Sequence, residues 1–353
     1  MKNDKIIFPD YYKDFKCKAD RCSENCCLGW EIDIDKETLG RYNSLCGALG
    51  EKIRKNIKSS DGISHFVMKN GRCPMLNEQN LCEIIISLGE GAICDICREH
   101  PRFYSELSGV TLGGVGMSCE AAAELIIKQK NPSLYGNILP LLDEDDEDFE
   151  ASALIASALF DSENILRSSE LSDNEKLALA LLCVRKAENG ISELYFGKDE
   201  EGAKEKIALP DGIFDNSFSE ALAKEILLVK DKILSLEFMG DELPKRISLA
   251  DGRKAHEMWN YSSGFRRVIL NCLGYLIARY LPKADGDFLP SEFISASITA
   301  LCLLYSECKA KDLDVKNNED QEALEKMIRT AVLFSSEIEY SEENVEKLHI
   351  REE

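Results

Sequence analysis

The chain has 353 residues, of which 44% are apolar, 43 are basic and 64 are acidic, and its formal net charge is −21. This apolar content excludes disorder over most of the chain, because disordered segments combine high charge with few hydrophobic residues. The acidic excess argues against a nucleic-acid-binding protein, which needs clustered lysine and arginine side chains to contact phosphates.

Membrane insertion and secretion are not expected either. The longest stretch without a charged residue, 293–306, is shorter than the roughly 18–20 apolar residues that a membrane span needs, and it contains serine and threonine. The first ten residues lack the apolar stretch of a secretion signal. The sequence therefore predicts a cytoplasmic protein without a transmembrane segment.

The first 130 residues predict short strands and two helices. Residues 31–35 alternate apolar and acidic side chains, as a half-buried strand does. Residues 64–68 and 110–112 are weaker strand candidates bounded by glycines, and helices are expected at 36–58 and 119–130.

Everything after residue 131 is predicted to be helix and loop. The six consecutive acids at 143–148 are interpreted as a solvated loop or a helix N-terminus, in preference to a site for a basic partner. Ser172 and Glu175 form a capping box ahead of an apolar run. The predicted helices are 149–167, 173–196, 217–239, 254–281, 291–310 and 318–349.

Charge and cysteine content both change near residue 130. Residues 1–130 carry 18 basic and 19 acidic groups, whereas residues 131–353 carry 25 basic and 45 acidic groups. Ten of the 14 cysteines lie in the first 119 residues. We therefore predict a mainly α protein, with a cysteine-rich metal-binding domain with short strands at 1–130 and an acidic all-helical domain at 131–353.

Nine of the early cysteines are the strongest chemical signal. Thiols stay reduced in the cytoplasm, so a dense set there indicates metal binding or catalysis. Four thiolates hold structural zinc or an iron–sulfur cluster, so nine provide either two sites or one site with spare thiols. The predicted ligands are Cys17, Cys22, Cys26, Cys27, Cys73, Cys82, Cys94, Cys97 and Cys119.

The spacing alone leaves the metal open. Only Cys94 and Cys97 have the C-x2-C spacing of zinc modules. The Cys22-x3-Cys26 spacing matches the start of the radical S-adenosylmethionine motif, but Gly29 stands where its third cysteine belongs, so that class is rejected. The late cysteines, by contrast, lie singly in apolar helical runs and are predicted to be core residues; they are Cys183, Cys272, Cys302 and Cys308.

The segment 15–35, with its double cysteine, resembles the start of the flagellin lysine-N-methylase family (FliB). Later blocks agree in order and spacing, and the similarity covers 8–127; these blocks are Cys73-Pro74-Met75-Leu76, Leu81-Cys82-Glu83-Ile84, Leu88-Gly89-Glu90, Cys94-x2-Cys97-x3-Pro101-Arg102 and Ser118-Cys119-Glu120-Ala121. One departure is visible, since the family tends to have a proline after the last cysteine, where this chain has Glu120. The double-cysteine and Cys-Pro pieces also resemble a broader group of zinc- or iron-chelating proteins.

The resemblance implies an S-adenosylmethionine-dependent enzyme that methylates lysine ε-amines of flagellin and carries a [4Fe-4S] cluster, with zinc as the alternative metal. The residues show no methyl-donor loop of the Rossmann type. The glycines at 113–116 follow a possible strand, but no ordered βαβ run surrounds them, and a turn leading into Cys119 is the preferred interpretation.

Methyl transfer to lysine needs a free amine and a site that accepts a sulfonium cation. Aromatic faces attract such a cation, and Trp30, Trp259 and Tyr261 are candidates, although each is more commonly a core aromatic. His100 is a candidate base or hydrogen-bond donor near the cysteines, although a surface histidine at a loop end is the preferred interpretation. Arg98 and Arg102 are candidates to balance thiolate charge.

Two functions of different classes remain. The first is a flagellin lysine methyltransferase with an iron–sulfur cluster held by the early cysteines. The alternative is a non-catalytic binding module that zinc or an iron–sulfur cluster stabilises and whose acidic helical half binds a basic partner.

Overall fold

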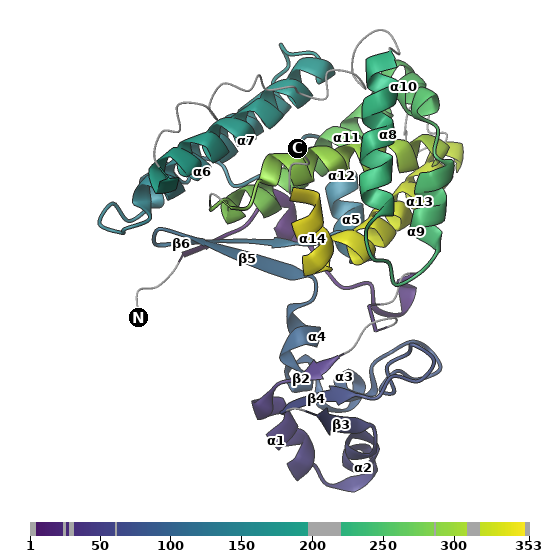
Figure 1. Cartoon of the computed structure of the whole chain (residues 1–353). Coiled ribbons are helices and arrows are strands. Elements are labelled where there is room, and N and C mark those ends of the chain that lie inside the picture. Colours follow the sequence, from purple (N-terminus) through teal and green to yellow (C-terminus); the bar gives the residue numbers. More distant parts are fainter. Residues whose placement is uncertain are drawn as a thin grey trace. The chain divides into compact units, whose positions relative to one another are not determined.

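The computed structural model describes residues 5–23, 26–27, 32–60, 62–196, 220–285, 287–308 and 318–349 (Figure 1). The fold is mainly α, with a few short strands, which confirms the predicted fold class. The chain forms two compact units. The cysteine-rich unit comprises 16–102 and 119–121, and the helical unit joins 1–15, 103–118 and 122–353.

A small three-stranded sheet belongs almost entirely to the helical unit. Strand β1 (Lys5–Ile7) pairs in parallel with β6 (Val110–Val115), and β5 (Arg102–Leu107) lies on the other side of β6. The composition predicts a division near residue 130. The compact units have other bounds, because this pairing joins the first residues of the chain to 110–115.

Two glycines of β6 let aromatic rings lie directly on the strand. A Cβ atom on Gly113 would be 2.4 Å from a ring carbon of Phe8, and one on Gly114 would be 2.3 Å from a ring carbon of Phe103. The predicted turn leading into Cys119 begins only at Met117, because residues 113–115 belong to the strand.

The helical unit is built around α11 (Ser263–Tyr280) and α12 (Pro290–Tyr305), which are buried on nearly all sides. Such helices are apolar all round and form a core instead of one amphipathic face. The two long helices α6 and α7 lie side by side (Figure 1). The other helices of this unit are α5 (Glu120–Ile127), α6 (Phe149–Arg167), α7 (Asp173–Phe196), α8 (Glu220–Leu234), α9 (Glu242–Leu249), α10 (Gly252–Tyr261), α13 (Asn318–Phe334) and α14 (Glu342–His349).

Helices with strong local signals have the predicted bounds, and longer predicted helices are divided. The bounds of α6 and α7 are those predicted, and the capping box is present: the Ser172 backbone N–H donates to Glu175 over 2.8 Å. The predicted helix 254–281 is wrong as one element, because the Ser262 hydroxyl accepts from the Phe265 N–H and starts α11. The predicted helix 318–349 is interrupted by a π-helix at Ser335–Glu339. Residues 217–219 and 309–310 of other predicted helices lie outside the described part.

A buried ion pair lies among aromatic side chains in the helical unit. Arg279 of α11 lies 3.3 Å from Glu339 of the π-helix, and both side chains are buried. The hydroxyls of Tyr275 and Tyr280 donate to the Glu339 carboxylate over 2.9 and 3.0 Å. Buried charges are stable when they are paired and hydrogen-bonded in this way, so the network links α11 to the C-terminal part of the unit.

The cysteine-rich unit contains shorter elements. Its strands β2 (Asp33–Ile34), β4 (Ile63–Phe66) and β3 (Ile57–Ser60) form an antiparallel sheet in that order. Two of the strands lie at the predicted places, around 31–35 and 64–68. The helices of the unit are α1 (Lys36–Ser44), α2 (Gly47–Lys55), α3 (Glu83–Leu88) and α4 (Asp95–Glu99).

The predicted single helix at 36–58 is wrong. The chain turns after α1, and Arg54 of α2 donates to the carbonyl oxygens of Tyr42 and Leu45 over 3.0 and 2.7 Å. Gly47 has a φ of +83°, which favours glycine and cannot continue a right-handed helix. The break therefore depends on contacts between the two helices.

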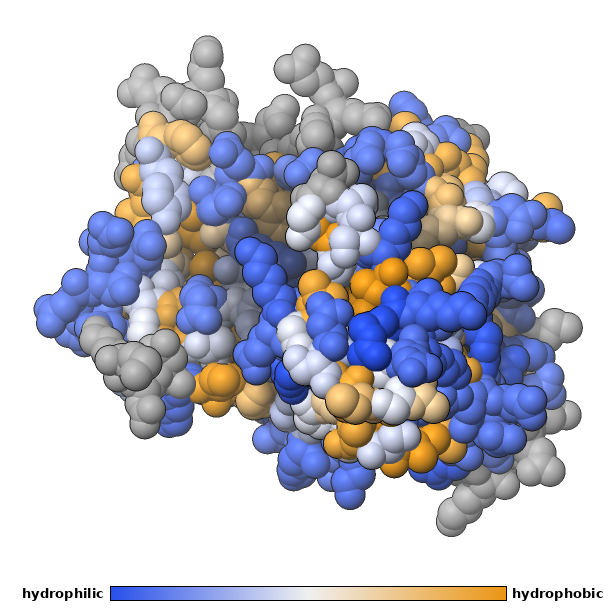
Figure 2. Space-filling view, turned by 90° about the horizontal axis from the view of Figure 1, so that it is seen from below, coloured by the Kyte–Doolittle hydropathy of each residue, from blue (hydrophilic) through white to orange (hydrophobic). Residues whose placement is uncertain are grey.

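The face of the molecule drawn in Figure 2 is largely hydrophilic. The face in Figure 2 shows charged and polar side chains interrupted by several separate apolar groups. This agrees with the acidic composition. None of the helices in the described residues is both long and apolar enough to cross a membrane.

Candidate metal centre

Five of the nine predicted ligands converge in one apolar core of the cysteine-rich unit. Cys73 and Cys94 are buried members of this core, and Cys27, Cys82 and Cys97 pack against it. Its apolar members include Ile32, Tyr42, Ile53, Phe66, Met75 and Ile84. Cys27, Cys73, Cys82, Cys94 and Cys97 are called the inner thiols below.

Backbone hydrogen bonds bring the first three inner thiols together. The N–H of Cys73 donates to the carbonyl of Cys27 over 3.0 Å, although the two residues are far apart in the sequence. Asn70 and Gly71 both have positive φ, which is typical of a tight two-residue hairpin turn, and they direct the chain into Cys73. An isolated bridge between Leu76 and Cys82 returns the chain to the start of α3.

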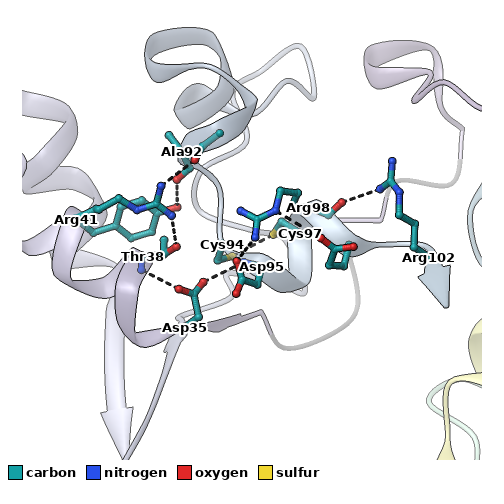
Figure 3. Close-up of polar contacts among 12 residues, drawn as sticks. Asp35, Thr38, Arg41, Ala92, Cys94, Asp95, Cys97, Arg98 and Arg102 are labelled. Carbon is teal, nitrogen blue, oxygen red and sulfur yellow. Dashed lines mark hydrogen bonds and ion pairs between the residues drawn. The ribbon is translucent and has the colours of Figure 1, made fainter. Parts of the chain in front are cut away.

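The other two inner thiols lie at the start of α4. The Sγ atoms of Cys94 and Cys97 are 3.4 Å apart. The Asp35 carboxylate accepts from the N–H of Thr38 over 2.8 Å and from the N–H of Asp95 over 3.0 Å (Figure 3). Asp35 therefore caps α1 and also holds the first turn of α4, where the C-x2-C pair begins.

In each of two hydrogen-bonded thiol pairs, one thiol has a lowered pKa and the other has a raised pKa. The hydrogen bond with Cys97 lowers the pKa of Cys94, and the hydrogen bond with Cys27 lowers the pKa of Cys26. The pKa values of Cys97 and Cys27 are raised, first by the same hydrogen bonds and then by burial. One member of each pair is therefore the more readily ionised thiol.

The inner thiols also affect one another across the core. The pKa of Cys73 is raised to about 11, mainly by burial and to a smaller extent by the charges of Cys82 and Cys94. Burial also raises the pKa of Cys82, with a contribution from Cys94. Cys73 in turn adds to the raised pKa values of Cys27 and Cys97. The five thiols thus lie within electrostatic range of one another.

The chemistry of this donor set fits a thiolate-bound metal centre. As the structure places them, the described residues contain no group of three or more His, Cys, Asp or Glu side chains that could hold a metal ion. The inner thiols nevertheless provide five sulfur donors in one core. Four sulfur ligands suit both zinc and an iron–sulfur cluster, so the donor set is compatible with either metal.

The remaining predicted ligands lie outside this core. Glu120, at the start of α5, accepts from the N–H and the hydroxyl of Ser23 over 2.7 and 2.6 Å and from Lys18 over 2.8 Å. Its carboxylate also lies 3.7 Å from the Cys22 Sγ. No local sequence pattern reveals this contact, because Glu120 and Cys22 are distant along the chain. The cysteines outside the core are Cys17, Cys22, Cys26 and Cys119.

The predicted charged partners of the cysteines have other contacts. Arg98 pairs with Asp95 and lies 3.5 Å from Glu99, so these carboxylates balance its charge (Figure 3). Arg102 donates to the carbonyl of Arg98 over 2.8 Å. His100 follows α4 at a loop end, as predicted, but it is half-buried and is not the surface histidine that the sequence favoured.

The two aromatic candidates for a sulfonium site that the structure describes have different surroundings. Trp259 is 1% exposed in the helical unit, and its ring N–H donates to Asn174 over 2.7 Å, so it is a core residue. Tyr261 is 86% exposed at the end of α10. Trp30 lies outside the described residues.

The late cysteines behave as core residues. Cys272, Cys302 and Cys308 are buried, and burial raises the pKa of each thiol, that of Cys272 to about 12. Cys183 is half-buried, and burial raises its pKa too. The prediction that the late cysteines pack in helices is confirmed for the three buried ones.

Comparison with known proteins gives three distant similarities. Over 143 residues, the chain is 26% identical to the flagellar biosynthetic protein FliU of Salmonella muenchen, an alignment that covers 38% of this chain and 85% of FliU. The chain is distantly similar to that flagellar protein. Over 135 residues, it is 25% identical to the lysine-N-methylases of Salmonella choleraesuis (strain SC-B67) and Salmonella typhimurium (strain LT2), covering 36% of this chain.

The alignment spans only a third of the length of the two lysine-N-methylases. No protein-family model matches the chain, and no solved structure matches it. The comparisons therefore support a distant relation to flagellar proteins of the FliB type, and they do not identify the cysteine ligands.

Proposed function

We propose that this protein is a methyltransferase that transfers methyl groups from S-adenosylmethionine to lysine ε-amines of flagellin, and that its inner thiols hold an iron–sulfur cluster. The observation that carries the proposal is the similarity to two lysine-N-methylases over 135 residues. The similarity to a flagellar biosynthetic protein supports flagellin as the substrate. The five sulfur donors in one core support the cluster.

The proposed reaction places two demands on the protein. Lysine reacts as the free amine, whose lone pair forms the N–CH₃ bond while the S–CH₃ bond of the sulfonium breaks and the amine loses a proton. Ordinary lysine has a pKa of about 10.4, so the site must desolvate the ammonium group or supply a base. Neighbouring carboxylates would raise this pKa and oppose the reaction.

The net negative charge suits this reaction if the acidic side chains lie away from the reacting amine. A net charge of −21 attracts a lysine-bearing partner from a distance. Apolar or aromatic groups at the reacting position would then lower the pKa of the lysine. We place the protein in the cytoplasm, where reduced thiols are available as ligands.

The test is methyl transfer by the full chain purified without oxygen. Labelled S-adenosylmethionine and flagellin are mixed with the protein, and mass spectrometry locates the methyl groups. We expect label on flagellin lysines and none on flagellin whose amines are acetylated beforehand. Absence of lysine methylation would refute the proposal.

The same experiment separates the alternative function. A metal-stabilised binding module would retain flagellin in a pull-down assay but would show no binding of S-adenosylmethionine by calorimetry. Methyl transfer together with donor binding excludes this alternative.

A further inference from the structure

We propose that Arg279, Glu339 and Tyr11 form a binding site in the helical unit for an α-amino-acid group, the carboxylate and ammonium end that methionine and S-adenosylmethionine share. In the proposed function this group belongs to the methyl donor, so the identity of the natural ligand rests on that proposal. The site itself is inferred from buried polar atoms that have no partner in the described part of the chain.

The first argument is that each of the three side chains has a buried polar atom without a hydrogen-bond partner among the described residues. These atoms are Nε of Arg279, Oε1 of Glu339 and the hydroxyl oxygen of Tyr11. All three residues are buried in the helical unit. Buried polar groups in folded proteins are nearly always hydrogen-bonded, so three such atoms indicate a place that receives a polar ligand.

The second argument is that the ion pair leaves complementary groups free. Nη1 of Arg279 donates to the Tyr275 hydroxyl over 2.6 Å and lies 3.3 Å from Oε2 of Glu339. The hydroxyls of Tyr275 and Tyr280 donate to the same Oε2 atom. The contacts within the described residues therefore use Nη1 and Oε2. The Nε–H of arginine donates to a carboxylate, and a carboxylate oxygen such as Oε1 accepts from an ammonium group.

Tyr11 adds a third polar group from a distant segment. It belongs to the 3-10 helix Asp10–Asp14, and the N–H of Asp10 donates to the Ser133 hydroxyl over 3.0 Å, which anchors this segment in the helical unit. Burial raises the pKa of Tyr11, and the positive charge of Arg279 opposes this increase. The two side chains therefore lie within electrostatic range of each other. A neutral hydroxyl both donates to a carboxylate and accepts from an ammonium group.

Aromatic rings hold the guanidinium group, and one of them reaches the surface. The Cζ atom of Arg279 lies 5.1 Å from the ring centre of Phe103 and 5.2 Å from that of Tyr340. Tyr340 is 44% exposed, and the Arg279 side chain itself is 7% exposed, so solvent reaches the guanidinium group. Glu339 belongs to the π-helix Ser335–Glu339, and such elements are frequent at functional sites.

The test measures ligand binding to the full chain, purified without oxygen, by isothermal titration calorimetry. S-Adenosylhomocysteine is compared with methylthioadenosine, which also has a neutral sulfur but lacks the amino-acid group. We expect S-adenosylhomocysteine to bind more tightly by about tenfold or more, because hydrogen bonds to charged groups are lost in the smaller ligand. Equal affinities, or no binding of either ligand or of methionine, would overturn the proposal.

Free methionine distinguishes the two sources of the amino-acid group. Much weaker binding of methionine than of S-adenosylhomocysteine supports the methyl donor as the ligand. Equally tight binding of methionine supports the site and contradicts the methyl donor as its ligand.

Tyr11→Phe tests the site without endangering the fold, because it removes only a hydroxyl that has no partner among the described residues. We expect it to weaken S-adenosylhomocysteine binding by about threefold to tenfold, with no loss of thermal stability and no change for methylthioadenosine. Ser162→Ala is the matched control, since it removes another such buried hydroxyl of the helical unit, from α6. Unchanged affinity in Tyr11→Phe would overturn the three-residue site.

Arg279→Lys and Glu339→Gln test the two charged groups. Lysine keeps the charge but has no Nε–H edge, and glutamine keeps the size of Glu339 but loses the negative charge that attracts an ammonium group. Both variants should bind S-adenosylhomocysteine more weakly by about tenfold or more. Circular dichroism shows whether each variant folds, and wild-type affinity in either folded variant would overturn the proposal.

The site and the proposed reaction fail separately. A protein that binds S-adenosylhomocysteine through Tyr11 and Arg279 but transfers no methyl group supports the site and contradicts the proposed function. A protein that methylates flagellin, and whose affinity for the methyl donor is the same in all three variants, supports the function and contradicts the site.

Discussion

At the residue scale, Asp35 has the most consequential position in the cysteine-rich unit. Burial of its carboxyl group opposes ionisation, but hydrogen bonds from the N–H groups of Thr38 and Asp95 outweigh this and lower the pKa of Asp35. The charged form is therefore the one that joins the two helix starts. The Asp35 carboxylate thus connects the start of α1 to the segment that carries Cys94 and Cys97.

Replacing Asp35 by alanine should destabilise the cysteine-rich unit. The change removes two helix-start hydrogen bonds, and loss of a helix cap typically costs about 1 kcal/mol, so we expect a decrease in unfolding free energy of about 1–2 kcal/mol. Urea denaturation followed by circular dichroism measures it. Asp33→Ala is the control, since Asp33 is exposed on β2 only two residues away. Equal stability of the two variants would contradict the capping role.

Gly114 provides a second residue-scale prediction. Gly114→Ala places a Cβ atom 2.3 Å from the Phe103 ring, and overpacking of this kind typically costs about 1–3 kcal/mol. Thermal unfolding should show the loss, and adding Phe103→Leu should recover part of it. Gly40→Ala is the control in an exposed helix, because no atom lies near its Cβ position; it should be neutral or stabilising. A stable Gly114→Ala variant would show that the ring does not lie on the strand.

At the element scale, local signals predicted the helices and tertiary contacts decided where they break. The bounds of α6 and α7 could be predicted because capping residues and an apolar period lie within each segment. The break after α1 could not, because it depends on Arg54 reaching back to the carbonyl groups of α1 and its end. The cysteines could be predicted as one set, because their short spacings are a local pattern in the sequence. The hydrogen bond between Cys73 and Cys27 joins distant residues and leaves no local pattern, so it could not be predicted.

A long-range cap links α7 to α12 and predicts a pH dependence. The buried Glu188 of α7 accepts from the N–H and the hydroxyl of Ser291 at the start of α12, the latter over 2.7 Å. Burial raises the pKa of Glu188. The folded protein therefore binds this proton more tightly than the unfolded chain, and stability falls as the pH rises from the ordinary glutamate pKa of about 4.3 through the higher folded value.

Glu188→Gln should remove this pH dependence. The amide keeps an acceptor and a donor for Ser291 but does not titrate, so the variant should gain stability relative to the wild type as the pH is raised from about 4 towards neutral. Thermal unfolding across this pH range measures the difference. Glu193→Gln is the control, since Glu193 is an exposed carboxylate of the same helix. If the stability of Glu188→Gln differed from that of the wild type by the same amount at every pH, titration of Glu188 would not cause the pH dependence.

At the scale of the whole molecule, the two units differ in how much regular structure supports them. The helical unit contains α6 of 19 residues, α7 of 24 residues, and the buried helices α11 and α12. The helices of the cysteine-rich unit have at most 9 residues. Short helices are marginal in isolation, so this unit needs further stabilisation, which a metal centre would provide.

Removal of the proposed metal should therefore loosen one unit and leave the other intact. After chelation without oxygen, hydrogen exchange should increase in α3 and α4 and in the loop around Cys73, because the inner thiols lose their common ligand. Exchange in α11 and α12 should stay unchanged, which makes them an internal control. Unchanged exchange around Cys73 and Cys94 would mean that apolar packing alone holds the five thiols together, and that they are ordinary core residues.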